Sequence, residues 1–137
     1  MGDKEFRLIG FNLTRIEAEK NPKFSGKINI EQNIKITDIK KQKLDLTKQE
    51  AVSVDFEMSL VYKELGKINL NGTLFLILDS KTMKELLKSW KKKRIPEQIN
   101  VLLLNLIIQK TAAKAFQIQE ELGLPPHIQI PVLRPKR

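Results

Sequence analysis

Between Phe6 and Leu78 the chain alternates hydrophobic and polar positions, the pattern of half-buried β-strands. Four stretches carry this pattern, and we expect strands over Phe6–Glu19, Ile28–Ile39, Val52–Tyr62 and Ile68–Leu78. In the first stretch the phase slips after Gly10, and a glycine at a phase slip is typical of a β-bulge. Asn21-Pro22 ends that strand, and the residues after it predict a loop or crossover.

Two segments in this half of the chain fit two structures each. Asp38–Lys48 is highly charged and fits either a loop or a continued strand at an exposed edge guarded by lysines. Asn71-Gly72 fits a tight turn. Because alternation continues on both sides of Gly72, we favour a strand in which another backbone approaches the glycine closely. Lys63–Lys67 predicts the hairpin turn before that strand.

After Asp79 the hydrophobic spacing changes to that of helices. Thr82 and Glu85 have the spacing of a capping box, which predicts the start of a short helix. That helix is expected to end in the cations Lys91–Arg94, which suit the negative end of the helix dipole.

A long helix is predicted from Pro96 to Leu122, because proline favours a first turn and Gly123 is a natural helix stop. Between Ile99 and Ile108 only two asparagines interrupt the hydrophobic residues. We expect one apolar stripe to contain Leu102, Leu103, Leu106, Ile107, Ala113 and Phe116. A helix that is apolar most of the way round is buried on more than one side. The apolar surface beyond that of a single helix face indicates a protected core, a subunit interface or a groove for an apolar ligand.

The ten-residue apolar run is shorter than the roughly 20 residues that span a bilayer, so we expect no membrane insertion. Strands followed by helices predict an α+β domain: a four-stranded antiparallel sheet followed by a short and a long C-terminal helix. With 137 residues, the chain is predicted to form one domain over residues 1–137. Ile128, Ile130 and Val132 alternate after the long helix, and a short basic tail is expected from about Arg134.

Composition narrows the functional classes. The absence of cysteine excludes disulfides, thiol catalysis and thiolate zinc sites, and it favours a cytoplasmic location. Met1–Phe6 is charged and no apolar core follows, so we expect no signal peptide. Lysine and arginine total 25 against 16 aspartate and glutamate, a formal charge of +9. This charge fits either an anionic partner or lysines on solvated faces, and we favour the second, because most lysines alternate with apolar residues or glutamates.

Candidate chemistry is sparse. The single histidine, His127, is expected to be a surface residue rather than a base or a metal ligand. Asp55 and Glu57 share a strand face and resemble a carboxylate pair for acid–base catalysis, although the solvated face of a sheet explains them more simply. The sequence has no phosphate-binding glycine loop and no nucleophile motif. We predict a protein that is not an enzyme, with no catalytic residues, no metal site and no cofactor.

Basic clusters leave nucleic-acid binding as an alternative. They are Lys40, Lys41 and Lys43; Lys88 with Lys91–Arg94; and the last residues of the chain. Aromatic side chains that could stack on bases are few, with Trp90 and Phe24 as candidates, and no known RNA- or DNA-binding motif surrounds them. We therefore expect that nucleic acid is not the main partner.

Several stretches together resemble the SecB family of protein-export chaperones, and they cover nearly the whole chain. Phe11–Pro22 is similar to that family's first strand, with its I-Y-x-K-D-x-S-F-E-x-P pattern, and Lys27–Leu46 to its second. Val52–Leu78 resembles the third and fourth strands, with Leu70–Thr73 where the family has a glycine-containing stretch. Ile99–Val132 resembles the long helix and the tail F-P-Q-L-N-L-x-P-V, here PHIQIPV, which is the most specific match.

The resemblance implies an ATP-independent holdase, a chaperone that binds unfolded or non-native polypeptides in hydrophobic grooves and prevents aggregation, for example in protein export or translocation. It also implies a homotetramer, a dimer of dimers with helices between the subunits. The first strand, the crossover loop and the long helix would line the client-binding groove. The candidate groove residues are Phe11, Leu13, Phe24, Ile28, Leu104, Ile108 and Ile130. For each of them, core packing is the competing interpretation.

The chain departs from that family in charge. Export-pathway members are acidic and end in an acidic tail that recruits the SecA motor, whereas this chain is basic and ends in Arg134–Arg137. SecA docking is therefore not expected. A positive holdase would select acidic clients or serve another partner, such as a toxin–antitoxin pair. Two other classes stay open: a basic α+β nucleic-acid-binding protein and a purely structural or assembly subunit.

Overall fold

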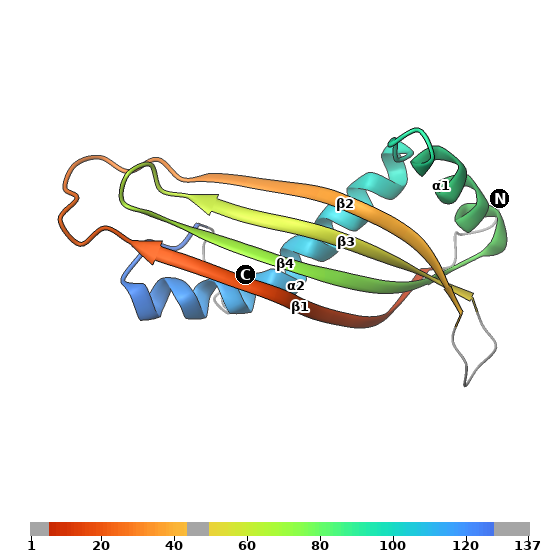
Figure 1. The fold of residues 1–137 in the computed structure, drawn as a ribbon, viewed down its shortest axis with the longest axis horizontal. Helices are drawn as coiled ribbons and strands as arrows, with labels where there is room; N and C mark the ends of the chain where they lie inside the picture. The colour runs from red at the N-terminus through yellow and green to blue at the C-terminus, as the bar shows by residue number, and fades with distance from the viewer. Residues whose placement is uncertain (1–5, 44–49, 128–137) are drawn as a thin grey trace, which may run out of the picture.

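The computed structural model describes residues 6–43 and 50–127, which form four strands and two helices. In chain order these are β1 (Phe6–Lys20), β2 (Glu31–Lys43), β3 (Glu50–Val61), β4 (Gly66–Leu78), α1 (Ser80–Trp90) and α2 (Glu97–Leu122). The strands form one layer, α2 crosses one face of it diagonally, and α1 lies at one end of the sheet (Figure 1). The predicted order of elements and the α+β class are confirmed.

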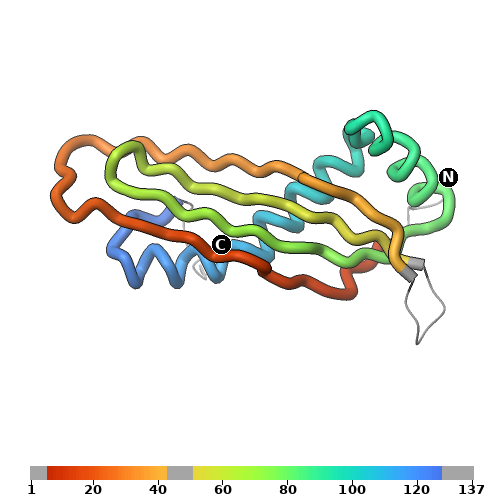
Figure 2. The backbone as a smooth tube through the Cα atoms, in the orientation of Figure 1, coloured from red at the N-terminus to blue at the C-terminus, as the bar shows by residue number. Residues whose placement is uncertain are grey.

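All paired strands are antiparallel, and their order across the sheet is β1-β4-β3-β2. β1 and β2 are consecutive in sequence but lie at opposite edges of the sheet. The segment between them, residues 21–30, therefore passes around the end of the β3–β4 hairpin (Figure 2). The backbone N–H of Asn21 donates to the carbonyl oxygen of Leu65 at 2.6 Å, which ties this crossover to the hairpin turn.

The core lies between the sheet and the helices. Inward-facing side chains of the two central strands are completely buried: Val52, Val54, Met58, Leu60, Ile68, Leu70, Leu74 and Leu76. Every second residue of β3 and β4 is thus removed from water, as the predicted alternation requires. At about 25 cal/mol per Å² of apolar area, this burial is the main stabilising contribution of the sheet.

β1 is irregular at two points. Its register against β4 slips between Leu8 and Gly10, which confirms the bulge predicted at the glycine, and it slips again between Leu13 and Arg15. Each slip places an extra residue in the edge strand and increases its local twist.

β2 begins at Glu31, so the prediction that this strand starts at Ile28 is wrong. Glu31 pairs with Val61, the last residue of β3, and residues before Glu31 have no strand to pair with. At its other end β2 continues to Lys43, so this part of the charged segment is strand, whereas residues 44–49 lie outside the described residues. A register slip within β2 turns Ile39 back toward the core, where it is 4% exposed.

Gly72 lies within β4, which confirms that Asn71-Gly72 is part of a strand rather than a turn. A Cβ atom at this position would lie 2.5 Å from the carbonyl oxygen of Asn12 on β1 and 2.8 Å from the ring of Phe56 on β3. The glycine is required because a backbone oxygen and an aromatic ring occupy the space that a side chain would fill.

α1 begins directly after Asp79, as the change in hydrophobic spacing predicts, and not at the capping box. Its N-cap is Asp79, whose carboxylate accepts hydrogen bonds from the backbone N–H of Thr82 at 3.0 Å and from the Thr82 hydroxyl at 2.6 Å. The prediction that Thr82 and Glu85 form a capping box is therefore wrong, because Asp79 already satisfies that N–H from the N-cap position.

α2 begins after Pro96 and ends before Gly123, which adopts the left-handed conformation with φ of 69°, as predicted. Its buried residues are Ile99, Leu103, Ile107, Thr111, Ala115, Ile118 and Gln119. The predicted stripe is wrong in its rotation, since Leu102 and Ala113 are exposed. A helix that is apolar nearly all round has no unique phase in its sequence, and packing against the sheet selects the buried face. Ile128, Ile130, Val132 and the basic tail from Arg134 lie outside the described residues.

Replacing Gly72 with alanine is expected to destabilise the protein by about 1–3 kcal/mol, because the oxygen of Asn12 belongs to the backbone and cannot rotate away. Urea unfolding measures this loss. Gly10→Ala is the matched control, since its Cβ would meet only the side chain of Phe75, at 3.2 Å, and that ring can shift. Equal losses of stability in the two variants would contradict the close approach at Gly72.

Candidate functional site

A groove opens between the edge strand β2, the end of α1 and the first half of α2. This β2 groove has a volume of about 640 Å³. Its lining residues are Ile34, Lys35, Ile36, Thr37, Trp90, Lys93, Ile95, Asn100 and Leu104. Five of them are large apolar residues, two are lysines and none is acidic. The groove therefore suits a ligand that is apolar in part and anionic in part.

A smaller hollow of about 100 Å³ lies on the β1 side of α2. Its lining residues are Phe6, Leu78, Thr82, Gln98, Ile99, Leu102 and Leu103. This hollow is almost wholly apolar and has the size of one aliphatic side chain.

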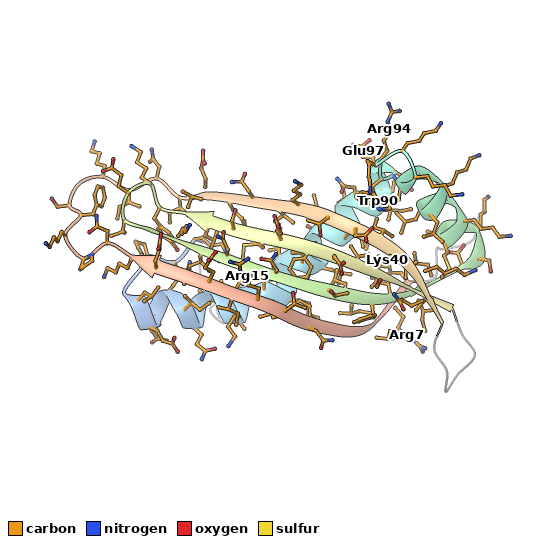
Figure 3. All side chains as sticks on the ribbon, viewed as in Figure 1. Arg7, Arg15, Lys40, Trp90, Arg94 and Glu97 are labelled. Atoms are coloured by element: carbon orange, nitrogen blue, oxygen red, sulfur yellow. The ribbon has the colours of Figure 1, made fainter. Side chains whose placement is uncertain are left out.

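Trp90, the last residue of α1, is held from two sides. Its indole Nε1 donates to Oδ1 of Asp38 on β2 at 3.3 Å, which links the helix to the edge strand. This hydrogen bond holds the pKa of Asp38 below its ordinary value, and Nζ of Lys40 lies 3.4 Å from the other carboxylate oxygen. On the ring face, Nζ of Lys93 lies 4.6 Å from the centroid, within cation–π range. Figure 3 shows Trp90 and Lys40 at this end of the molecule.

The turn after α1 has an unusual backbone. Lys93 adopts the left-handed conformation, with φ of 58°, although glycine is the residue that adopts it at least cost. The N–H of Lys93 donates to the carbonyl of Trp90 at 2.8 Å, and the N–H of Arg94 donates to that of Ser89 at 3.1 Å. Lys93 thus ends this turn in the left-handed conformation, with its ammonium group over the ring of Trp90.

The face of α2 directed away from the sheet stays apolar. Val101 is 52% exposed and Leu102 is 38% exposed. Further along the helix this outer face of α2 continues with Ile108, Ala112 and Phe116, which are half-buried. Exposed apolar patches of this kind mark interaction sites. In the described part of the chain, α2 is also the one helix long and apolar enough to cross a membrane, a test that a core helix passes too.

The seven predicted groove residues lie in separate places. Four are half-buried and pack against the core, namely Phe11, Leu13, Phe24 and Ile28. The ring of Phe11 stacks on Phe56, with centroids 6.0 Å apart. Leu104 lines the β2 groove, and Ile108 is half-buried one turn further along α2. Ile130 lies outside the described residues.

Sequence reasoning missed Ile34, Ile36 and Trp90 as groove residues. The alternation of β2 shows that the two isoleucines share a face, but it does not show which edge of the sheet the helices leave open. One signal was present: lysines interleave with apolar residues along this strand, a pattern typical of an edge.

The candidate catalytic carboxylates lie on the sheet face opposite α2. Oδ1 of Asp55 accepts a hydrogen bond from the hydroxyl of Thr73 at 2.7 Å, and Oε1 of Glu57 accepts one from the amide of Asn71 at 3.4 Å. Each carboxylate is thus bonded to a polar side chain of the adjacent strand, as on a solvated sheet face. Among residues 6–43 and 50–127, no group of three or more His, Cys, Asp or Glu side chains is arranged to hold a metal ion.

His127 is not the surface residue that its position predicts. It is half-buried, its ring centroid lies 5.8 Å from that of Phe116, and its Nδ1 lies 2.9 Å from Nε2 of Gln119. The same amide nitrogen donates to the hydroxyl of Tyr62 at 2.6 Å, and that hydroxyl donates to the carbonyl of Pro125 at 2.7 Å. This cluster fixes the chain after α2 against the hairpin end of the sheet. Burial lowers the pKa of His127 and raises that of Tyr62.

A comparison with solved structures finds this arrangement in a SecB-like chaperone, Rv1957 of Mycobacterium tuberculosis, in complex with a ChAD peptide from the Rv1956 HigA1 antitoxin. The alignment covers 96% of this chain and 93% of that chain, with a TM-score of 0.53 and 12% sequence identity. The present chain therefore has a SecB-like fold. No family model matches the sequence, and neither does any curated protein.

The stability of the protein is expected to fall as the pH drops below about 6.5, the ordinary pKa of histidine. Because the pKa of His127 is lowered in the folded protein, the unfolded chain binds this proton more readily. The stabilisation that comes from burying neutral His127 is therefore fully present above the pKa of histidine in the unfolded chain. It is lost as the pH falls through the lower pKa of His127 in the folded protein. Free energies of unfolding measured in urea from pH 7.5 to 5.5 report this loss.

His127→Gln removes the only histidine and is expected to flatten the pH dependence over the same range. If the variant keeps the slope of the original protein, another group causes it.

Proposed function

We propose that this protein is an ATP-independent holdase that binds unfolded or non-native polypeptide segments and acts by binding rather than by catalysis. The observation that carries the proposal is the apolar surface left open on both sides of α2, within a fold that matches a SecB-like chaperone along nearly its whole length. The proposal places the protein in the cytoplasm, in agreement with the absence of cysteine.

Apolar burial would supply most of the affinity. Each large apolar side chain that leaves water gains about 1.5–3 kcal/mol, and the β2 groove presents five large apolar residues to receive such chains. Ordering a flexible client opposes this gain, so binding is expected to be reversible. Native proteins hide the side chains that the groove needs, and preference for the unfolded state follows from mass action without ATP.

The edge of β2 would supply a second contribution. Within the described residues β2 pairs with β3 alone, so its other edge faces the groove side without a strand partner. An extended client that adds to this edge gains backbone hydrogen bonds that do not depend on its sequence. A holdase for many clients needs such an interaction.

The outer face of α2 is proposed as the interface of a homotetramer, a dimer of dimers. Val101 and Leu102 are the most exposed large apolar residues of the helix, and self-association would remove them from water. SecA docking is not part of the proposal, because the chain is basic, with a formal charge of +9. Since the SecB-like neighbour was solved with an antitoxin peptide, an antitoxin is a candidate client alongside exported proteins.

Leu104→Asp is expected to reduce holding about ten-fold or more, because it removes roughly 1.5–3 kcal/mol of apolar contact from the β2 groove. The measurement is light scattering while a chemically denatured model protein is diluted without ATP. Ser80→Asp adds the same charge at an exposed position of α1 and should leave holding unchanged. If a folded Leu104→Asp variant still prevents aggregation fully, the β2 groove is not the client-binding site.

Val101→Asp is expected to dissociate the assembly, because it places a charge in the proposed apolar interface. Light scattering coupled to gel filtration gives the mass of each species. Asn29→Asp, in the exposed crossover, is the control and should keep the original mass. A monomeric original protein would count against the interface.

A further inference from the structure

We infer that the exposed side of α1 binds the phosphate backbone of double-helical nucleic acid without reading its base sequence. This site is separate from the β2 groove and does not depend on the holdase function. Three features of α1 support it: the concentration of positive charge, the cost of that charge to the helix, and the polar character of the whole exposed side.

Positive charge is concentrated at α1. The segment from Ser80 to Glu97 contains seven lysines and arginines but only two glutamates, so it holds more than half of the +9 of the whole chain. Five exposed lysines follow one another at helical spacing, and we call them the basic face of α1: Lys81, Lys84, Lys88, Lys91 and Lys92. In the described part of the chain none of the five is paired with a carboxylate. Figure 3 shows nitrogen-tipped side chains that extend from α1 into solvent.

The stability of α1 does not account for all of these lysines. Cations suit the C-terminal end of a helix, which explains Lys88 and Lys91. Lys81, however, lies in the first turn, where the positive end of the helix dipole disfavours a cation. Lys84 and Lys88 are four residues apart, a spacing at which like charges repel each other. The basic face therefore opposes the stability of its own helix, which indicates that it serves binding.

The spacing of the charges suits nucleic acid. From Lys81 to Lys91 a lysine recurs every three or four residues, so this side of α1 carries a cation about every 5 Å at 1.5 Å per residue. A nucleic-acid duplex carries a negative charge about every 1.7 Å of its axis, so phosphates can oppose every lysine of the basic face. One face of an extended polypeptide presents a side chain only about every 7 Å, and each of these would have to be acidic.

The exposed side of α1 offers little to a protein or a membrane. Across α1 and the turn after it, the exposed residues are Ser80, Glu85 and the cations. The apolar Met83 and Leu86 are buried against the core. A protein interface needs an apolar core, and an interfacial helix needs apolar side chains that enter the membrane. Binding to a phosphate backbone is electrostatic and needs neither.

The position of Trp90 favours a duplex over a single strand. Single strands bind through bases that stack on exposed aromatic faces. Trp90, the aromatic residue of α1, is half-buried and has Nζ of Lys93 4.6 Å from its ring centroid. Its indole N–H donates to Asp38, which holds the ring against β2. No free aromatic face of α1 thus accompanies the basic face, and a duplex, whose bases are already stacked, does not need one.

The experiment follows the anisotropy of a fluorescein-labelled RNA duplex of about 20 base pairs as the protein is added at several salt concentrations. The affinity is expected to fall at least about ten-fold between roughly 50 and 200 mM salt, because phosphate contacts release counterions. A duplex of unrelated sequence should bind equally well.

Two triple variants that remove the same charge test the location. Lys84→Gln with Lys88→Gln and Lys91→Gln should weaken binding about ten-fold or more at low salt and reduce the salt slope by about two to three. The control combines Lys23→Gln, Lys27→Gln and Lys63→Gln, three exposed lysines at the opposite end of the sheet, and should bind like the original protein. Arginine at the three α1 positions keeps the charge and should keep the binding.

Equal losses in the two glutamine variants, or a loss in the arginine variant, would overturn the inference. So would displacement of the duplex by polyglutamate, by vesicles that contain phosphatidylserine or by a thymidine oligonucleotide at a lower concentration of charge than unlabelled duplex requires. The α1 glutamine variant should still suppress aggregation, since its three substituted positions lie outside the lining of the β2 groove. A protein that suppresses aggregation but does not bind the duplex refutes the nucleic-acid site alone, and the reverse result refutes the holdase function alone.

Discussion

The structure depends on one constraint: one long helix, with a short helix at one end, must cover one face of a four-stranded sheet. α2 has 26 residues, about 39 Å of helix, and crosses the sheet diagonally (Figure 1). A helix is about 10 Å wide and the outer strands of such a sheet lie roughly 15 Å apart, so a diagonal helix leaves a corner open on each side. The two hollows described above lie on either side of the first half of α2, and the far side of the helix has no sheet to cover it.

The two edge strands face the same danger of uncontrolled pairing, and the chain protects them differently. β1 uses 15 residues against the 13 of β4, and its two register slips break the regular ladder along that edge. β2 contains one slip and depends on lysines instead. An edge protected by shape rejects every strand, whereas an edge protected by charge rejects only strands of the same charge. β2 can therefore leave its outer edge unpaired without joining copies of itself.

The sheet could be predicted because alternation along each strand is a local property. The roles of Gly72 and Gly123 could also be predicted from the sequence, since each glycine satisfies a local steric requirement. Features that depend on distant packing could not be predicted. The buried face of α2 is selected by the sheet, and the placement of His127 depends on Gln119, which its own neighbours in sequence do not reveal. The groove escaped prediction for the same reason: Trp90 and β2 are brought together only by the fold.

The placement of the two polar aromatic residues has an optical consequence. The chain has one tryptophan and one tyrosine, and they lie at opposite ends of the sheet. Trp90 borders the β2 groove, whereas Tyr62 anchors the segment that follows α2. Intrinsic emission excited at the indole band therefore reports events at the groove, and the tyrosine signal reports release of that anchor. The molecule carries two separate spectroscopic reporters, one for each end, without any added label.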